Sequence, residues 1–457
     1  MYTPPIFFFG LRFKMAPIQK LARYLVSLEL WVVGIAVFLS MAVNGLLPWV
    51  VALMAVYWVV RRVAWGKGLP RGTGSGLPRG TGRGMVATRV DFPVAFLVLL
   101  IPLNAWISPL PEKSLPQLLR LLSGIGLFYA IVNALVSEHS VLPVRKRLDG
   151  MVWSALIVAV GMGVFSLFSV QWANDKLPFM PEKIYSFASI LVADTVHPNV
   201  MAGTLVIFLP ILLGIMMFAG GEMPKWQRLV FVFSILSVIA VLVLTQSRGA
   251  LISFGVALLG LILLRWRWAY PEVRGGGWIG AGAGIVLIAG TIWRTGWDRV
   301  LDTVLVSATL GGVNGREQIW QRALYIIQDF PLTGVGMGLF GDVADALYPF
   351  AGVEPGRISH AHQLFLQVAV DLGLPGFAAW LTILGLVFLS AWQMYRGARG
   401  KNNRWMAGLG AGLLGSQTAL CVHGLLDAVT WGMVRPAPLV WGIWGLTMAA
   451  WMLREQG

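Results

Sequence analysis

The chain has 457 residues, of which 57% are hydrophobic and only 12% are charged. Together with a mean hydropathy of +0.74, this low charge excludes an ordinary soluble domain, in which about a quarter of the residues are charged. The formal net charge of +15 would suit nucleic acid, so the placement of the basic residues decides what it means. The single cysteine, Cys421, excludes an intrachain disulfide and a cysteine-rich metal site.

Successive apolar runs predict an all-α, polytopic membrane protein with about twelve transmembrane helices and both ends in the cytoplasm. The predicted spans are 25–45, 47–60, 93–108, 115–136, 150–170, 198–219, 229–246, 250–264, 278–293, 363–393, 405–422 and 437–453. With this topology, the loops facing the cytoplasm hold roughly two thirds of the basic residues, as the positive-inside rule expects. The charge is thus explained by topology and by contact with anionic membrane lipids, and we expect no nucleic-acid partner.

Two segments interrupt the alternation of helix and short loop and divide the chain into three predicted regions. Residues 66–84 contain a repeated Gly-Leu-Pro-Arg-Gly-Thr-Gly unit, which is typical of a flexible cytoplasmic linker. Residues 294–361 form a long loop on the outer side of the membrane. The predicted regions are therefore an N-terminal group of about nine helices (1–293), the outer loop (294–361) and the C-terminal helices (362–457).

The outer loop has helical periodicity between Ile319 and Ile327, which predicts an amphipathic helix that ends at Phe330-Pro331. The closely spaced Gly334, Gly336 and Gly338 follow it and predict a turn, with a close approach of the backbone to a ligand as one interpretation. A long, ordered loop of this kind is more often functional than a spacer.

Two arginines on the outer side are candidate anion-binding residues. Arg248, beside Gly249, lies in the turn between two spans, where it must bind an anion or extend to water. Arg316 lies at the start of the loop helix, where an ordinary ion pair with Glu317 is the structural alternative.

The histidines of the outer side are candidates for proton transfer. His362 is predicted to begin a helix, and imidazole is the side chain best suited to accept a proton from a hydroxyl near neutral pH. His360 lies two residues away, too close to share a helical face with His362; metal binding by the pair is an open alternative that the sequence does not support further. His197 opens another helix from the outside, where a purely structural cap is the alternative. His423 and Asp427, four residues apart, are predicted to be a structural pair at a helix end.

Several chemistries have no support in the sequence. The outer side has no pair of acidic residues in a pattern that would hold a divalent cation, and no phosphate-binding loop suggests ATP. Acidic residues are scarce within the spans, Glu29 being the plainest, which argues against an ion-coupled transporter. We therefore predict no cofactor and no metal.

Five short motifs resemble the O-antigen ligase and polymerase superfamily over roughly residues 190–380. They are Thr245-Gln246-Ser247-Arg248-Gly249, Gly315-Arg316-Glu317-Gln318-Ile319-Trp320, Gly334-Val335-Gly336, His362-Gln363 and, after nine further residues, Gly373-Leu374-Pro375-Gly376. His197-Pro198-Asn199 is similar to another element of this family. The most specific of these features is the spacing from His362-Gln363 to the last motif.

The resemblance implies a metal-independent, inverting glycosyltransferase of the GT-C type in a bacterial inner membrane, with its active site facing the periplasm. The implied donor is a glycan linked to undecaprenyl pyrophosphate, and the acceptor hydroxyl belongs to a glycan, a lipid core or a protein. Its catalytic residues would be His362, Arg248 and Arg316. The further candidates for substrate binding are His197, Asn199, Arg322, Arg357, His360 and Gln363.

Three alternatives remain open. Within the same class, the enzyme is a polymerase that joins lipid-linked repeats, or an oligosaccharyltransferase that modifies protein. From another class, the chain is a transporter or flippase of lipid-linked sugars, but basic residues deep in the spans would then be expected, and the outer loop would have no role.

Overall fold

The computed structural model describes residues 15–65, 86–136, 142–170, 172, 196–270, 313–350 and 353–454. Nearly all of these residues are helical. The α-helices are α1 (Met15–Ala42), α2 (Leu47–Trp65), α3 (Asp91–Ile107), α4 (Pro111–Val136), α5 (Val144–Ser169), α7 (Pro198–Ala219), α8 (Lys225–Leu244), α9 (Arg248–Ala269), α12 (Val313–Asp329), α13 (Phe340–Leu347), α14 (Leu364–Gly400), α15 (Arg404–Leu426) and α16 (Pro438–Leu453). Two short 3₁₀ helices, Asn44–Leu46 and Gly220–Glu222, complete the described part.

The helix lengths confirm a polytopic helical membrane protein. In the described ranges nine helices are long and apolar enough to cross a bilayer, and the shorter apolar helices α3 and α16 accompany them. Each predicted span except 278–293 coincides with one of these helices. That span and the linker 66–84 lie outside the described residues, and the division into three regions stays a prediction.

The bundle is built around α15, which packs against α7, α9 and α14, while α16 packs against α4. Glycines bring α7 and α15 into backbone contact: a Cβ at Gly214 would lie 2.5 Å from the Gly408 carbonyl oxygen and 2.6 Å from Gly412 Cα. Small residues four apart allow such close approach in membranes, where apolar surface alone gives helices little reason to associate. The first part of α15 is therefore packed closely against α7.

Glu29 of α1 forms a buried ion pair with Arg61 of α2. A charged pair at this depth stabilises only if both groups are satisfied, because each group loses its hydration. Glu29, the acidic residue that the sequence places within a predicted span, is thus paired with Arg61 on the adjacent helix.

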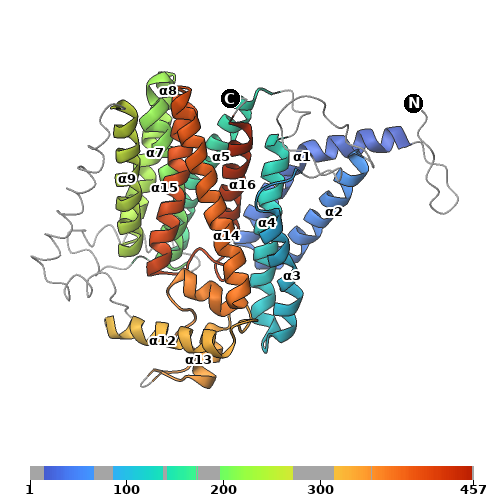
Figure 1. The fold of residues 1–457 in the computed structure, drawn as a ribbon, viewed down its shortest axis with the longest axis vertical. Helices are drawn as coiled ribbons and strands as arrows, with labels where there is room; N and C mark the ends of the chain where they lie inside the picture. Colours follow the sequence, from blue (N-terminus) through green and yellow to red (C-terminus); the bar gives the residue numbers. More distant parts are fainter. Residues whose placement is uncertain are drawn as a thin grey trace, which may run out of the picture.

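The outer-loop helices α12 and α13 lie across one end of the bundle (Figure 1). α12 ends at Asp329, one residue before the Phe330-Pro331 boundary expected from the sequence. Its apolar face, with Ile319, Ala323 and Ile326, is buried in a separate small core that also contains Phe340 of α13. The predicted amphipathic helix is confirmed, and its buried face covers the end of α14.

A break in α14 receives the loop that follows α12. Gly373 has φ 69° and ψ 177°, so the ladder of helical hydrogen bonds stops there. Leu374 N, which would donate to the Val370 carbonyl in a helix, donates instead to the Pro331 carbonyl at 2.7 Å. The Val370 carbonyl accepts from Val335 N at 2.9 Å. The chain thus exchanges one helical hydrogen bond for two bonds to the outer loop.

Pro375 makes a second carbonyl available, because proline has no N–H for the carbonyl of Asp371. Asn104 Nδ2 of α3 donates to this carbonyl at 2.7 Å, and Asn104 Oδ1 accepts from Met337 N at 3.0 Å. Gly334 has φ 63°, and a Cβ on it would lie 2.4 Å from the Val370 carbonyl oxygen. At Gly334 the close neighbour is therefore the backbone of α14, whereas a Cβ at Gly336 would meet Leu339 and Ser108 and one at Gly338 would meet the Gln117 side chain.

We predict that Gly373→Ala destabilises the protein. The backbone conformation at this position costs a residue with a side chain about 1–3 kcal/mol, and a Cβ would lie 2.7 Å from the Leu332 carbonyl. The midpoint of thermal unfolding of the detergent-solubilised protein should fall. Gly385→Ala is the matched control, since a Cβ at this position of α14 meets no atom within 4 Å. Equal midpoints for the two variants would contradict the role given to the break.

Candidate functional site

The candidate site lies where the end of α15 meets the segment that precedes α14. Asp427 is the first residue after α15, in extended conformation with φ −160° and ψ 158°, and its backbone N–H donates to the His423 carbonyl at 2.8 Å. Its side chain is buried, with 5% exposed. The start of α7 lies at the same place, because Asn199 in its first turn contacts Asp427.

The Asp427 carboxylate accepts hydrogen bonds from three separate segments of the chain. Oδ1 lies 3.1 Å from His360 Nε2 and 3.4 Å from His362 Nδ1, and Oδ2 accepts from Asn199 Nδ2 at 3.0 Å. Ala428 N donates to Oδ1 at 2.8 Å. A buried carboxylate needs such compensation for its lost hydration. Asp427, His360, His362 and Asn199 are called the Asp427 cluster below.

The two imidazoles meet because neither lies in a helix. α14 begins only at Leu364, with Gln363 as its N-cap, and His362 has φ 48°, in the left-handed region. This local turn places the ring centroids of His360 and His362 3.9 Å apart. The expectation that His362 begins a helix is therefore wrong, and the argument from a shared helical face does not apply to the two histidines, because neither is helical.

Buried polar side chains fix the segment that carries the histidines. Gln367 Oε1 accepts from the backbone N–H of Ala361, between the two histidines, at 2.8 Å. Gln367 Nε2 donates to Asp371 Oδ1 at 2.9 Å, and the same carboxyl accepts from Gly338 N at 3.1 Å and from Trp431 Nε1 at 2.8 Å. The histidine segment, the outer loop and the loop after Asp427 are thereby joined through one buried side chain, Asp371.

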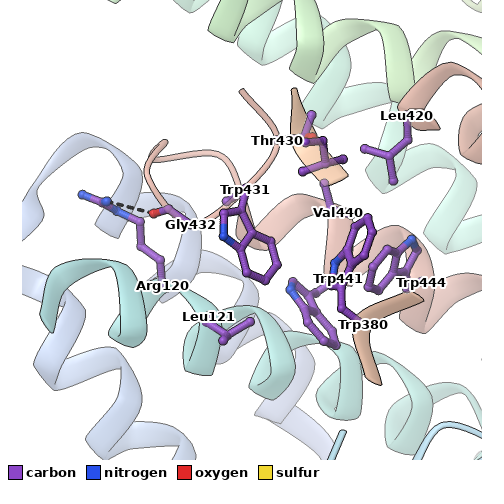
Figure 2. A pocket seen from close by; sticks show the side chains of 12 residues that line it. Arg120, Leu121, Trp380, Leu420, Thr430, Trp431, Gly432, Val440, Trp441 and Trp444 are labelled. Carbon is purple, nitrogen blue, oxygen red and sulfur yellow. Dashed lines mark hydrogen bonds between the residues drawn. The ribbon is translucent and has the colours of Figure 1, made fainter. Parts of the chain in front are cut away.

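Tryptophans support the loop that follows Asp427 (Figure 2). Trp431 packs edge-on against Trp380, with ring centroids 6.1 Å apart, and Trp441 and Trp444 lie beside them. Arg120 of α4 donates to the Gly432 carbonyl at 3.1 Å. The cavity among these rings has a volume of only about 10 Å³, enough for about one water. It serves as packing under the site and has no room for a sugar.

Both candidate arginines belong to helices that reach the end of α15. Arg316 Nη1 donates to the carbonyl of Leu426, directly before Asp427. Arg316 Nε is buried and has no hydrogen-bond partner in the described part of the chain. Arg248 is the first residue of α9, and a Cβ on its neighbour Gly249 would lie 3.3 Å from Leu426 Cβ. The first turn of α9 and Arg316 therefore both lie against Leu426.

The other residues singled out in the sequence have varied positions. His197 caps α7, its Nδ1 accepting from Asn199 N at 3.2 Å, which is the structural alternative stated for it. Arg322 of α12 lies over the Phe350 ring, 5.1 Å from its centroid, and donates to the carbonyls of Gln318 and Pro349. Arg357 is exposed in the loop before α14, and Gln363 Oε1 accepts from Leu366 N. Of the predicted substrate-binding residues, Asn199 and His360 contact Asp427.

Asp427 is the residue that sequence reasoning did not select. Its i, i+4 relation to His423 suggested a helix-end pair, but its carboxylate contacts His360 and Asn199. Those partners are 67 and 228 positions away in the chain, so no local pattern contains them. The available signal was weaker: an acidic residue at an outer helix end, on the same side as the histidines.

Burial and hydrogen bonding set the protonation of the cluster. Burial lowers the pKa of His362, and the hydrogen bond to Asp427 opposes this only in part, so the imidazole is neutral at pH 7. Burial alone would raise the pKa of Asp427, but the hydrogen bonds with His360 and His362 hold it well below its usual value. A neutral imidazole on an ionised carboxylate can accept a proton, and the carboxylate then stabilises the cation.

The same three side chains also form a donor set for a cation. One ligand atom each of His360, His362 and Asp427 lies within 4.8 Å of the others. Two imidazoles and a carboxylate suit a divalent transition metal. The cluster is thus chemically competent both as a hydrogen-bonded base and as a metal ligand set, which experiment distinguishes.

We predict that Asp427→Asn lowers the pKa of His362 further, because the ionised carboxylate raises it in the native protein. NMR of the full chain labelled with ¹⁵N-histidine should show the His362 ring titrating at lower pH. Asp342→Asn is the control, since that carboxylate lies in an exposed pair with Lys113 at 2.5 Å. An unchanged titration in Asp427→Asn would show that the contact is electrostatically unimportant.

Comparison with known proteins gives one family match. Residues 229–381 match a family model described as O-antigen ligase, which spans α8 to the part of α14 beyond its break. The matched segment includes Arg248, Arg316, His360 and His362, whereas Asn199 and Asp427 lie outside it. No curated protein matches the chain. The resemblance noted in the sequence is confirmed over this segment, in which residues 229–381 of a multi-pass membrane protein match the O-antigen ligase family.

Proposed function

We propose that the protein is a membrane glycosyltransferase that moves a glycan from undecaprenyl pyrophosphate to an acceptor hydroxyl at the outer face of a bacterial inner membrane. The observation that carries this proposal is the Asp427 cluster next to Arg316, with its histidines and arginine inside the O-antigen ligase domain. The family implies transferase activity of the ligase or polymerase type. The transfer is proposed to be metal-independent and inverting.

The Asp427 cluster provides the base. His362 Nδ1 lies on Asp427, which leaves Nε2 to accept the proton of the acceptor hydroxyl. The hydroxyl oxygen then attacks the anomeric carbon of the donor sugar as the bond to the pyrophosphate oxygen breaks, and the proton remains on His362. Asp427 stabilises the resulting imidazolium. Positioned base catalysis of this kind typically contributes about 10²–10⁴-fold.

The arginines provide for the leaving group. Negative charge on the pyrophosphate increases as the glycosidic bond breaks, and a fixed guanidinium stabilises it in a site with little water. The buried Nε of Arg316, without a partner in the described residues, is a donor available for such an oxygen. Arg248, at the first position of α9, would add a second positive charge and the N-terminal end of a helix.

The polymerase remains the second candidate, because the donor and the catalytic step are the same and only the acceptor differs. Purified protein incubated with lipid-linked oligosaccharide separates the alternatives. A ladder of products indicates a polymerase, and a single addition to a lipid core, glycan or protein indicates a ligase. Absence of any product, with movement of the lipid-linked sugar between leaflets, would support the transporter instead.

We predict that Arg316→Ala lowers the turnover of glycan transfer by about 10²–10³-fold. Removal of one hydrogen-bond donor to a developing negative charge has an effect of this size in other enzymes. Arg248→Ala is expected to act in the same direction. Glu317→Gln is the matched control, because Glu317 is the exposed neighbour of Arg316 on α12. Full activity of either folded arginine variant would remove that residue from the mechanism.

For His362→Ala the expected loss of turnover is about 10²–10⁴-fold, with donor binding largely kept. In the native enzyme, turnover should fall as the pH decreases through the pKa of His362, which burial places below its usual value near 6.5, because protonation removes the base. At higher pH it should be constant. A pH profile that stays unchanged in Asp427→Asn would argue against the paired base.

Removal of metal tests the other chemistry of the cluster. We expect that dialysis against EDTA leaves the transfer rate unchanged and that added Zn²⁺ or Mn²⁺ does not increase it. Inhibition by EDTA that a divalent cation reverses, and that is lost in His360→Ala, would identify the three side chains as metal ligands.

A further inference from the structure

A basic cleft lies at the opposite end of the bundle from the Asp427 cluster, between the C-terminal ends of α9 and α14. It has a volume of about 620 Å³ and is lined by Arg267, Trp392, Tyr395, Arg396, Arg399 and Gly400. None of the described residues that line it is acidic. The alternation of spans and the concentration of basic residues place this end in the cytoplasm. These six residues are called the α9–α14 cleft.

Within the described residues, the three guanidinium groups of the cleft, those of Arg267, Arg396 and Arg399, have no carboxylate partner. At the same end of the molecule, Arg404 lies 3.8 Å from Glu222, and Arg265 donates to the Met217 carbonyl at 3.0 Å. Three like charges that line one concavity repel one another unless an anion lies between them.

The wall of the cleft is held in place by hydrogen bonds. Arg399 Nη2 donates to the Arg267 carbonyl at 2.9 Å, and the buried Tyr395 hydroxyl donates to the Leu264 carbonyl at 2.8 Å. These bonds fix the end of α9 against α14. The positive charges are therefore presented on a preformed surface, and the anion need not order the two helices on binding.

The cleft also has an apolar side that points to a lipid. Trp392 is seven residues before Arg399, so it lies about 10 Å deeper along α14. The Arg396 guanidinium lies 6.0 Å from its ring centroid. The cleft thus has cations at its cytoplasmic rim and a half-buried tryptophan on the side toward the hydrocarbon. Tryptophan is enriched at this boundary between headgroups and hydrocarbon. A free phosphate would use only the rim.

We propose that the α9–α14 cleft binds the headgroup of an acidic glycerophospholipid of the cytoplasmic leaflet. The phosphate lies between Arg267, Arg396 and Arg399, and the glycerol and upper acyl chains lie against Trp392. Basic pockets between transmembrane helices on the cytoplasmic side recognise such headgroups. This site is independent of the glycan-transfer site, since the two lie at opposite ends of α14.

The test uses the full-length protein purified in detergent and titrated with phosphatidylglycerol or phosphatidylcholine, with bound lipid counted by native mass spectrometry. Phosphatidylglycerol should be retained in preference to phosphatidylcholine. The double variant Arg267→Gln, Arg396→Gln should weaken phosphatidylglycerol binding roughly 10- to 30-fold, since each basic residue near a lipid surface contributes modestly. Arg399 is left intact because it holds α9.

The matched control is Lys225→Gln with Arg404→Gln, which removes the same charge from exposed positions at the same end, outside the cleft. Equal lipid binding by the two double variants would overturn the proposal. A further arm replaces lipid with inorganic phosphate: displacement of phosphatidylglycerol by millimolar phosphate would identify a free-phosphate site and also overturn it. Binding that the Arg267→Lys, Arg396→Lys variant preserves in part, and phosphate does not displace, supports the lipid.

Discussion

The arrangement of the site depends on one buried carboxylate. Asp427 joins α7 through Asn199, the segment before α14 through His360 and His362, and, through the adjoining Leu426 carbonyl, the outer-loop helix α12. An ionised group with so little exposure is stable only when its hydrogen bonds replace its lost hydration. The hydrogen bonds that compensate the burial of Asp427 therefore also hold the start of α7 and the histidine segment in place.

The break in α14 connects the site to the outer loop and to α3. A straight helix would carry its hydrogen bonds internally and offer the outer loop no backbone partner. With Gly373 and Pro375, the carbonyls of Val370 and Asp371 are freed and accept from Val335 N and Asn104 Nδ2. Asp371 then bonds to Gln367, which holds the backbone between the histidines. The spacing from His362-Gln363 to the glycine motif is thus the length of helix that connects the catalytic candidates to the point where the loop is anchored.

The sequence predicts the spans well because bilayer thickness, a property of the solvent, determines how long an apolar helix must be. The loop helix was also predictable, since Ile319, Ala323 and Ile326 repeat with helical period. The meeting of His360 and His362 was not, because it depends on a left-handed backbone at a residue with a side chain, which leaves no pattern. Asp427 was missed for a related reason, as its partners come from other helices. Local rules describe neighbours in the chain, and this site is made of contacts between distant segments.

The charges around the Asp427 cluster bear on the proposal that it acts as a hydrogen-bonded base without a metal. Arg316 donates to the carbonyl next to Asp427, and its positive charge acts on both Asp427 and His362, lowering the pKa of the latter. A divalent cation between the two histidines and the single carboxylate would add two positive charges close to this guanidinium, with one negative charge to offset them. A pyrophosphate leaving group would have the opposite effect, because its negative charge would offset the positive charge of Arg316 beside the cluster. The proposed anionic donor would therefore suit the charges around the cluster better than a cation would, because Arg316, which would repel the metal, would also hold the donor.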